Sequence, residues 1–146
     1  MRKAIILTGL PGSGKSTIAE QLVAAGAAAC SADYYFIKEG VYRYVPAEIG
    51  LAHAHCMRKF IEHIGGNTGL GADIVVDNTN TTSVEIAPYV AVANAFGWEH
   101  EILRVECDPE VAFARQTHGV SRATFHHMER NLRQPLPPWW NVKHAG

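Results

Sequence analysis

Residues 3–17 read KAIILTGLPGSGKST and contain the segment that decides the fold. Within this stretch, residues 9–16 (GLPGSGKS) match the pattern G-x-x-x-x-G-K-[ST] without a gap. The apolar run at residues 3–8 is typical of a buried parallel strand, and residues 16–25 carry apolar side chains at helical spacing. Glycines let the backbone wrap tightly, so that successive N–H groups and the helix N-terminus point at phosphate oxygens. The stretch therefore predicts a phosphate-binding loop between a central strand and a helix.

Side chains at the end of this loop predict how a nucleotide and its metal ion are held. Lys15 can reach the β and γ phosphates, the Ser16 hydroxyl can ligate Mg²⁺, and Thr17 can contact the α phosphate. ATP and Mg²⁺ are therefore the expected cofactors. The residues expected to bind the nucleotide are Gly9, Pro11, Gly12, Ser13, Gly14, Lys15, Ser16 and Thr17.

Strands and helices alternate along the rest of the chain. Apolar and periodic segments predict strands near residues 27–32, 72–77 and 98–107, and helices near residues 46–64, 83–96, 109–117 and 121–132. This order predicts one α/β domain over residues 1–146, with helices on both faces of a parallel sheet of four or five strands. A small helical lid is expected at about residues 115–123. The tail at residues 133–146 contains three prolines, so we expect no regular structure there.

Composition restricts the class of protein. The chain is 47% hydrophobic and 18% charged, and its net charge of −1 argues against a protein that coats nucleic acid through bulk charge. Three widely spaced cysteines indicate neither a disulfide framework nor a zinc site, and the histidine pairs lack the spacing of metal ligands, so no structural zinc is expected. The apolar run near Met1 is too short for a signal peptide or a membrane span. We therefore expect a cytoplasmic protein without a membrane partner.

Two aspartates follow predicted strands at the edge where the phosphate loop lies. Asp33 follows the second strand and Asp77 ends the third. Ligands in open α/β sheets bind beyond the carboxyl ends of the strands, so both carboxylates are expected near the γ phosphate. A carboxylate there can accept the proton of an attacking hydroxyl or help to hold Mg²⁺. Asp77, together with Ser16, is the candidate for the metal.

Three further motifs follow the phosphate loop in order: SADYYF at residues 31–36, VVDNTNTTSVEIAPYV at residues 75–90 and HGVSRATFHHM at residues 118–128. Over roughly residues 3–132 the series resembles the kinase domain of the polynucleotide kinase family, which implies a P-loop kinase fold. The match is closest to kinase-like domains of eukaryotic ubiquitin-ligase-binding proteins and looser to bacteriophage polynucleotide kinases. The resemblance implies that Asp33 is the general base on the acceptor hydroxyl, and that either Asp77 or Asn78 carries the role of the D-N-T-N segment.

The sequence departs from the phage enzymes at Phe36. In those enzymes an arginine at this position holds a phosphate of the acceptor strand. Phe36 cannot do so, because its side chain has no charge and no hydrogen-bond donor. The resemblance therefore leaves the acceptor less well defined than the phosphate donor.

An aromatic cluster follows Asp33 directly. Five aromatic residues fall between positions 34 and 44, namely Tyr34, Tyr35, Phe36, Tyr42 and Tyr44. A base that stacks on such rings gains about 1–3 kcal/mol without any demand on its sequence. The residues expected to contact the acceptor are Asp33, Tyr34, Phe36, Tyr42, Arg43, Asn78 and Asn80.

Two arginines flank Gly119 in the expected lid. Closing the lid would place the guanidinium of Arg115 or Arg122 against the γ-phosphoryl group and exclude water. Trp139 and Trp140 in the tail could stack on a base or pack the tail against the domain, and packing is the favoured alternative. The residues expected to be catalytic are Lys15, Asp33, Arg115 and Arg122.

These features predict an ATP- and Mg²⁺-dependent kinase that phosphorylates a hydroxyl on a nucleic acid, either DNA or RNA. The acceptor would be a 5′-hydroxyl end or the hydroxymethyl group of a modified pyrimidine such as 5-hydroxymethyluracil, as in phage kinases of DNA hypermodification. One alternative is a small-molecule kinase for a nucleoside, an antibiotic or a nucleotide sugar. Another is a nucleotide-binding switch, although no N-K-x-D motif is present to read guanine.

Overall fold

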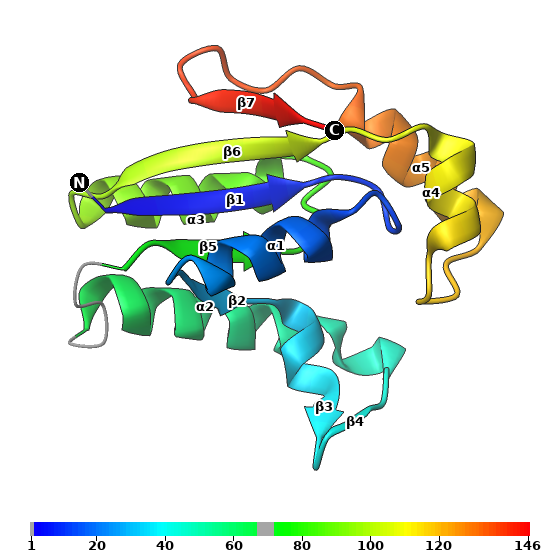
Figure 1. The fold of residues 1–146 in the computed structure, drawn as a ribbon, viewed down its shortest axis with the longest axis horizontal. Helices are drawn as coiled ribbons and strands as arrows, with labels where there is room; N and C mark the ends of the chain where they lie inside the picture. Colours follow the sequence, from blue (N-terminus) through cyan, green and yellow to red (C-terminus); the bar gives the residue numbers. More distant parts are fainter. Residues whose placement is uncertain (1, 67–71) are drawn as a thin grey trace.

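The computed structural model describes residues 2–66 and 72–146. Its main feature is a five-stranded sheet in the order β2-β5-β1-β6-β7, in which all neighbouring strands are parallel (Figure 1). The strands of this sheet are β1 (Lys3–Thr8), β2 (Ala28–Cys30), β5 (Ile74–Asp77), β6 (Glu99–Val105) and β7 (Val142–Ala145). The prediction of a parallel α/β sheet with a P-loop kinase architecture is confirmed.

Helices connect the strands and cover both faces of the sheet (Figure 1). The α-helices are α1 (Lys15–Ala24), α2 (Ile49–Gly65), α3 (Ser83–Ala95), α4 (Pro109–Arg115) and α5 (Arg122–Leu132). Two 3-10 helices, η1 (Ala32–Phe36) and η2 (Pro46–Glu48), flank a small hairpin of β3 (Ile37–Lys38) and β4 (Val41–Tyr42). The helix expected from residue 46 therefore begins as the 3-10 turn η2 and becomes α-helical at Ile49.

Strand β1 is central because its side chains alternate between two buried faces. Ala4 and Ile6 pack with residues of α2 and α3, whereas Ile5 and Leu7 pack against α1. Such burial on both faces is what its unbroken apolar sequence predicts. The phosphate loop that follows β1 therefore extends from the most deeply buried strand of the sheet.

Helices α4 and α5 lie beyond the carboxyl end of β6 rather than on a face of the sheet (Figure 1). They share a separate small core in which Leu10 of the phosphate loop packs with Ala112 and Phe125. Phe113 and Phe125 meet edge to face with ring centroids 5.1 Å apart. The two helices are thus packed against the phosphate loop at the edge where the other strands also end.

The tail contains a strand, so the prediction that residues 133–146 lack regular structure is wrong. Ile102 N–H donates to Asn141 O at 2.8 Å and Glu106 N–H donates to Ala145 O at 2.7 Å, which adds β7 to the free edge of β6. All three prolines precede β7, and proline is excluded from a strand only where its missing N–H would pair. Trp140 and Val142 pack against the core on the α3 side of the sheet.

Within residues 2–66 and 72–146, no helix combines the length and the apolar character that crossing a membrane requires.

The two adjacent tryptophans of the tail provide a test of this packing. Trp140 packs on the main core, whereas the side chain of Trp139 is 78% exposed. We expect Trp140→Ala to lower the free energy of unfolding by about 2 kcal/mol, since it removes a large apolar side chain from a packed site. Trp139→Ala should change it by less than about 0.5 kcal/mol. Urea denaturation monitored by circular dichroism measures both, and equal effects would contradict the assigned packing.

Candidate active site

The phosphate loop follows a path that only glycine permits at one position. Gly12 has a φ of 81°, and a Cβ there would lie 2.1 Å from the carbonyl oxygen of Ala112 on α4. The start of the loop is fixed by Gly9 N–H, which donates to Thr79 O at 2.9 Å. Ser13 Oγ is buried and has no hydrogen-bond partner among the described residues. An unsatisfied buried hydroxyl beside the N-terminus of α1 fits the binding of a phosphate oxygen.

Lys15 lies buried at the start of α1, with its Nζ donating to Leu10 O at 2.9 Å. Burial lowers the pKa of Lys15 to about 8, because desolvation penalises the charged ammonium. The carboxylates of Asp77 and Asp33 oppose this shift by Coulombic attraction. Both aspartates therefore lie close enough to the ammonium to act on its charge, as expected from the sequence.

Ser16 and Asp77 form an oxygen pair beside Lys15. The Ser16 hydroxyl donates to Asp77 Oδ2 at 3.4 Å. Burial raises the pKa of Asp77, and the nearby Lys15 ammonium partly offsets this. One hydroxyl and one carboxylate are the hard oxygen ligands that Mg²⁺ uses when phosphates and water complete its shell, so the pair fits this ion. Over the described parts of the chain, no group of three His, Cys, Asp or Glu side chains could hold a metal by itself.

The asparagines of the D-N-T-N segment face into the protein. Asn78 Oδ1 accepts from Ala32 N–H at 2.9 Å, and Asn80 Nδ2 donates to Leu7 O at 2.9 Å. Their exposed fractions are only 9% and 2%. The expectation that Asn78 and Asn80 contact the acceptor therefore needs correction, because their polar atoms bind the backbone at the ends of β1 and β2. Asn78 therefore fixes the backbone just before Asp33. Asn80 fixes the end of β1, the strand that precedes the phosphate loop.

Asp33 points outward from the first turn of η1, where its N–H donates to the Ser31 hydroxyl at 3.2 Å. Its side chain is 51% exposed and is therefore accessible to a substrate. The Tyr42 hydroxyl donates to Asp33 Oδ1 at 3.3 Å. Desolvation, followed by the charge of Asp33, raises the pKa of Tyr42 to about 12. Tyr42 thus stays a neutral hydrogen-bond donor to the carboxylate at physiological pH.

The rings that follow Asp33 differ in their exposure. Tyr34 and Tyr42 are exposed, as is Arg43 at the end of the hairpin, so these expected contacts are available to an acceptor. Phe36 is only 1% exposed and meets the Tyr42 and Tyr44 rings edge to face from beneath, at centroid distances of 6.2 and 5.1 Å. The expectation that Phe36 contacts the substrate is therefore corrected. The phenylalanine supports the exposed rings from below.

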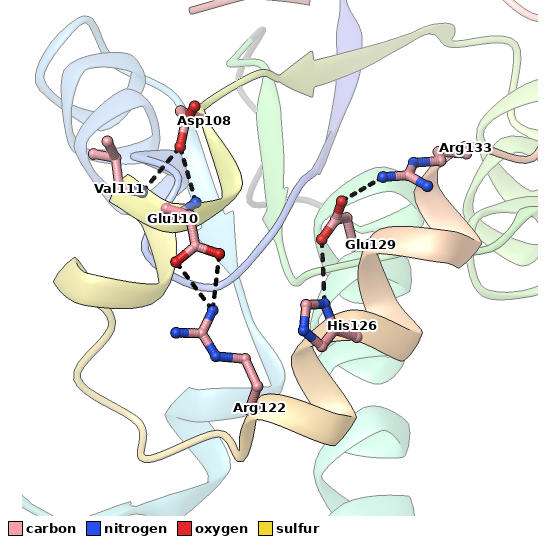
Figure 2. Close-up of polar contacts among 7 residues, drawn as sticks. All are labelled: Asp108, Glu110, Val111, Arg122, His126, Glu129 and Arg133. Atoms are coloured by element: carbon pink, nitrogen blue, oxygen red, sulfur yellow. Dashed lines mark hydrogen bonds and ion pairs between the residues drawn. The ribbon is translucent and has the colours of Figure 1, made fainter.

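Neither lid arginine is free of protein contacts. Arg122 at the start of α5 binds both carboxylate oxygens of Glu110 on α4, at 3.1 and 3.3 Å, as Figure 2 shows. Its guanidinium also lies 3.7 Å from the centroid of the Phe113 ring. Arg115 donates to Cys107 Sγ at 3.1 Å. Each of these contacts uses one terminal nitrogen of the guanidinium, so the remaining N–H donors of both arginines have no hydrogen-bond partner among the described residues.

Figure 2 also shows the charges farther along α5. Glu129 contacts both His126 and Arg133, one turn away on either side. His126 is therefore part of a surface ion-pair group on the helix.

Sequence reasoning missed one residue of the site, His118. It lies in the turn between α4 and α5, and its Nε2 is 3.8 Å from Asp33 Oδ2. Its ring also meets the Tyr42 ring with centroids 5.6 Å apart. The only available signal was its position next to Gly119 in the expected lid, which does not indicate where the turn points.

A phosphate loop, two carboxylates at the same sheet edge and a pair of helices beyond it define a P-loop domain of the kinase-like class. The family model described as the AAA domain matches residues 5–135, and the chain belongs to this family. Human NEDD4-binding protein 2 is 31% identical over 145 residues, a match that covers 90% of this chain. The chain spans only 8% of the length of that relative.

Solved structures share the fold at lower sequence identity. A chain of the Pnkp1/Rnl/Hen1 RNA repair complex is 16% identical with a TM-score of 0.71, covering 90% of this chain and 44% of that one. Chaetomium thermophilum Kti12 in complex with ADP-AlF3 is 19% identical with a TM-score of 0.66, covering 98% and 88%. A sugar kinase from Janibacter is 14% identical with the same TM-score, covering 99% and 85%. Structural similarity thus extends to proteins named for quite different substrates.

The lowered pKa of Lys15 predicts a proton linkage to nucleotide binding. Near pH 8 the free amine is about half protonated, whereas bound phosphates favour the ammonium and raise its pKa. Binding of Mg²⁺-ATP at pH 8.5 should therefore take up most of one proton, and binding at pH 7 almost none. Calorimetric titration in buffers of different ionisation enthalpy measures this uptake. Lys15→Met should abolish the difference, and equal uptake at both pH values in the wild type would contradict the linkage.

Proposed function

We propose that this protein is an ATP- and Mg²⁺-dependent kinase that transfers the γ-phosphoryl group to a hydroxyl on a nucleic acid. The observation that carries the proposal is the position of Asp33. Its carboxylate is half exposed, lies within electrostatic reach of the buried Lys15 ammonium, and stands at the foot of exposed tyrosine rings. A proton acceptor thus lies between a phosphate site and a surface suited to a flat group.

The chemistry assigned to these residues is an in-line displacement. The acceptor hydroxyl oxygen forms a bond to the γ phosphorus while the bond to the β–γ bridging oxygen breaks, and its electron pair leaves with ADP. Asp33 accepts the proton of the attacking hydroxyl. Lys15 and the backbone N–H groups of the phosphate loop hold the β and γ phosphates in position.

Ser16 and Asp77 are the residues assigned to Mg²⁺, which when bound would neutralise charge on the β and γ phosphates. Arg122 and Arg115 are assigned to the transferring phosphoryl group. Arg115 contacts Cys107 and Arg122 contacts Glu110, and both arginines belong to helices that pack against the phosphate loop. Contact of their guanidinium groups with phosphate would add cationic stabilisation only when the donor is in place.

The exposed rings favour a nucleic-acid acceptor. Tyr34 and Tyr42 flank Asp33, and stacking on rings holds a base irrespective of its identity. The structural similarity to a chain of an RNA repair complex is in keeping with this acceptor. Both a 5′-hydroxyl end and the hydroxymethyl group of a modified pyrimidine present an alcohol next to a base, so both remain acceptors of this proposal.

A small-molecule kinase is the second candidate. The buried Phe36 occupies the position at which the resembling phage enzymes hold an acceptor phosphate, and so this position offers no charge to a phosphate. The sugar kinase of the same fold has a similar length, since the match covers 99% of this chain and 85% of that one. To bind and activate a free nucleoside or sugar, the site would need only Asp33 and one surface that stacks on a ring or binds hydroxyl groups.

Labelling with γ-³²P-ATP and Mg²⁺ separates the acceptors. The panel contains 5′-hydroxyl DNA and RNA oligonucleotides, 5′-blocked oligonucleotides with 5-hydroxymethyluracil, free nucleosides and simple sugars. We expect label on a nucleic acid, detected by gel electrophoresis and nuclease digestion. Label confined to nucleosides or sugars would establish the second candidate, and label on none of the nucleic acids would refute the proposed function.

Substitution of the proposed base separates a kinase from a nucleotide-binding switch. Asp33→Asn keeps the shape of the side chain but removes its proton affinity, so transfer should fall about 100- to 10,000-fold. The dissociation constant for ATP should not increase, since the Asp33 carboxylate is negatively charged and does not attract the phosphates. Glu39→Gln is the matched control, because it removes one negative charge from the exposed hairpin tip. Transfer by Asp33→Asn at the wild-type rate would contradict the assignment.

A further inference from the structure

The lid turn contacts the proposed base directly. His118 Nε2 lies 3.8 Å from Asp33 Oδ2, while the Tyr42 hydroxyl donates to the other oxygen, Oδ1, at 3.3 Å. The His118 and Tyr42 rings meet at a centroid distance of 5.6 Å with their planes inclined by 63°. We call Asp33, Tyr42 and His118 the base cluster. Its members come from η1, β4 and the α4–α5 turn, three segments that are distant in the sequence.

The turn that carries His118 is held in shape by its own contacts. The Gln116 side chain donates to Val120 O at 2.8 Å and accepts from Val120 N–H at 2.9 Å, which closes residues 116–120 into a loop. Gly119 takes a φ of 69° at its tip. Val120 packs on the small core shared by α4 and α5. His118 is therefore presented from a braced turn rather than from a loose loop.

The same turn is connected to the phosphate site. Gln116 N–H donates to Ala112 O at 3.0 Å, and this carbonyl is the group that a Cβ at Gly12 would strike. The carboxyl-terminal half of α4 thus contacts the phosphate loop and leads directly into the His118 turn. A movement of the phosphate loop can therefore shift His118 relative to Asp33 through two short segments, α4 and the turn at residues 116–120.

We propose that His118 is a positioning residue that docks the lid on the base and orients the Asp33 carboxylate toward the acceptor hydroxyl. This inference rests on the proposed kinase function. The Tyr42 hydroxyl donates a hydrogen bond to one oxygen of this half-exposed carboxylate, and His118 Nε2 lies 3.8 Å from the other oxygen, close enough to form a hydrogen bond after a small movement of the turn. A misplacement of about 1 Å in a reacting group can reduce a rate about 100-fold.

The docked lid also determines what happens to the phosphoryl group. With His118 beside Asp33 and Tyr42, the lid turn lies next to the acceptor side of the site, where it would limit the entry of water once an acceptor is bound. Water competes with the acceptor hydroxyl as the nucleophile. Loss of the contact should therefore slow transfer and increase the share of ATP that is hydrolysed.

Three variants test the assignment. His118→Leu removes the contact while keeping a similar volume, His118→Gln retains an N–H donor near the position of Nε2, and His127→Leu makes the same change at an exposed position of α5. Exposed ion pairs contribute little to stability, so all three should fold. We expect His118→Leu to lower kcat for transfer about 10- to 100-fold with KM for ATP within about twofold. The fraction of ATP converted to inorganic phosphate should rise.

The conservative variant distinguishes positioning from packing. His118→Gln should recover most of the transfer rate, and His127→Leu should match the wild type. Wild-type transfer by His118→Leu would overturn the assignment, as would an effect confined to KM for ATP. An equally large loss of transfer rate in His118→Gln and in His118→Leu would also overturn the assignment, because a side-chain N–H donor at position 118 would then make no difference.

A second measurement does not depend on transfer. Arg115 and Arg122 flank the turn, so trypsin cleavage at these residues, followed by mass spectrometry, reports how firmly the lid is docked. Cleavage in the full chain should be about 3- to 10-fold faster for His118→Leu and Asp33→Ala than for the wild type or His127→Leu. An unchanged rate in His118→Leu would overturn the docking contact. If His118→Leu is cleaved faster but the wild-type protein labels no acceptor, the docking contact is supported and the proposed kinase function is refuted.

Discussion

The close approach of Gly12 to helix α4 is the constraint on which the site depends. A Cβ at Gly12 would lie 2.1 Å from Ala112 O and 2.9 Å from Gln116 N, so no other residue fits without displacing the helix. A Cβ at Gly9 would similarly approach Val105 O at 2.9 Å, at the end of β6. The phosphate loop is therefore wedged between a strand end and a helix. The phosphate loop is thus in backbone contact both with the end of β6 and with α4, the first helix of the lid.

Much of this arrangement follows from the sequence. The run KAIILT predicts a central strand because it has no polar side at all, and the glycines of GLPGSGKS predict the loop. Asp33 and Asp77 could be assigned to one edge because parallel strands all end on the same side of a sheet. The Coulombic influence of both carboxylates on Lys15 agrees with that rule.

Other features depend on contacts that local patterns do not encode. Strand β7 forms because the outer edge of β6 is free to pair, and nothing in the sequence of residues 142–145 indicates that edge. The aromatic spacing after Asp33 does not reveal that Phe36 points inward while Tyr42 points outward, since the segment has neither helical nor strand period. The meeting of His118 with Asp33 depends on the direction of a turn whose shape is set by the Gln116 side chain.

The sheet order has a consequence for how the site is assembled. Ala4 of β1 pairs with Ile74 on one side and His100 on the other, so the first strand of the chain finds its partners only in later parts of the sequence. Such non-local pairing gives the fold a high contact order, and loop-closure entropy must be overcome before any of these contacts forms. Lys15, Asp33 and Asp77 therefore come together only when β1, β2 and β5 have joined the sheet. The arrangement of these three side chains is thus a property of the cooperatively folded chain and of no single local segment.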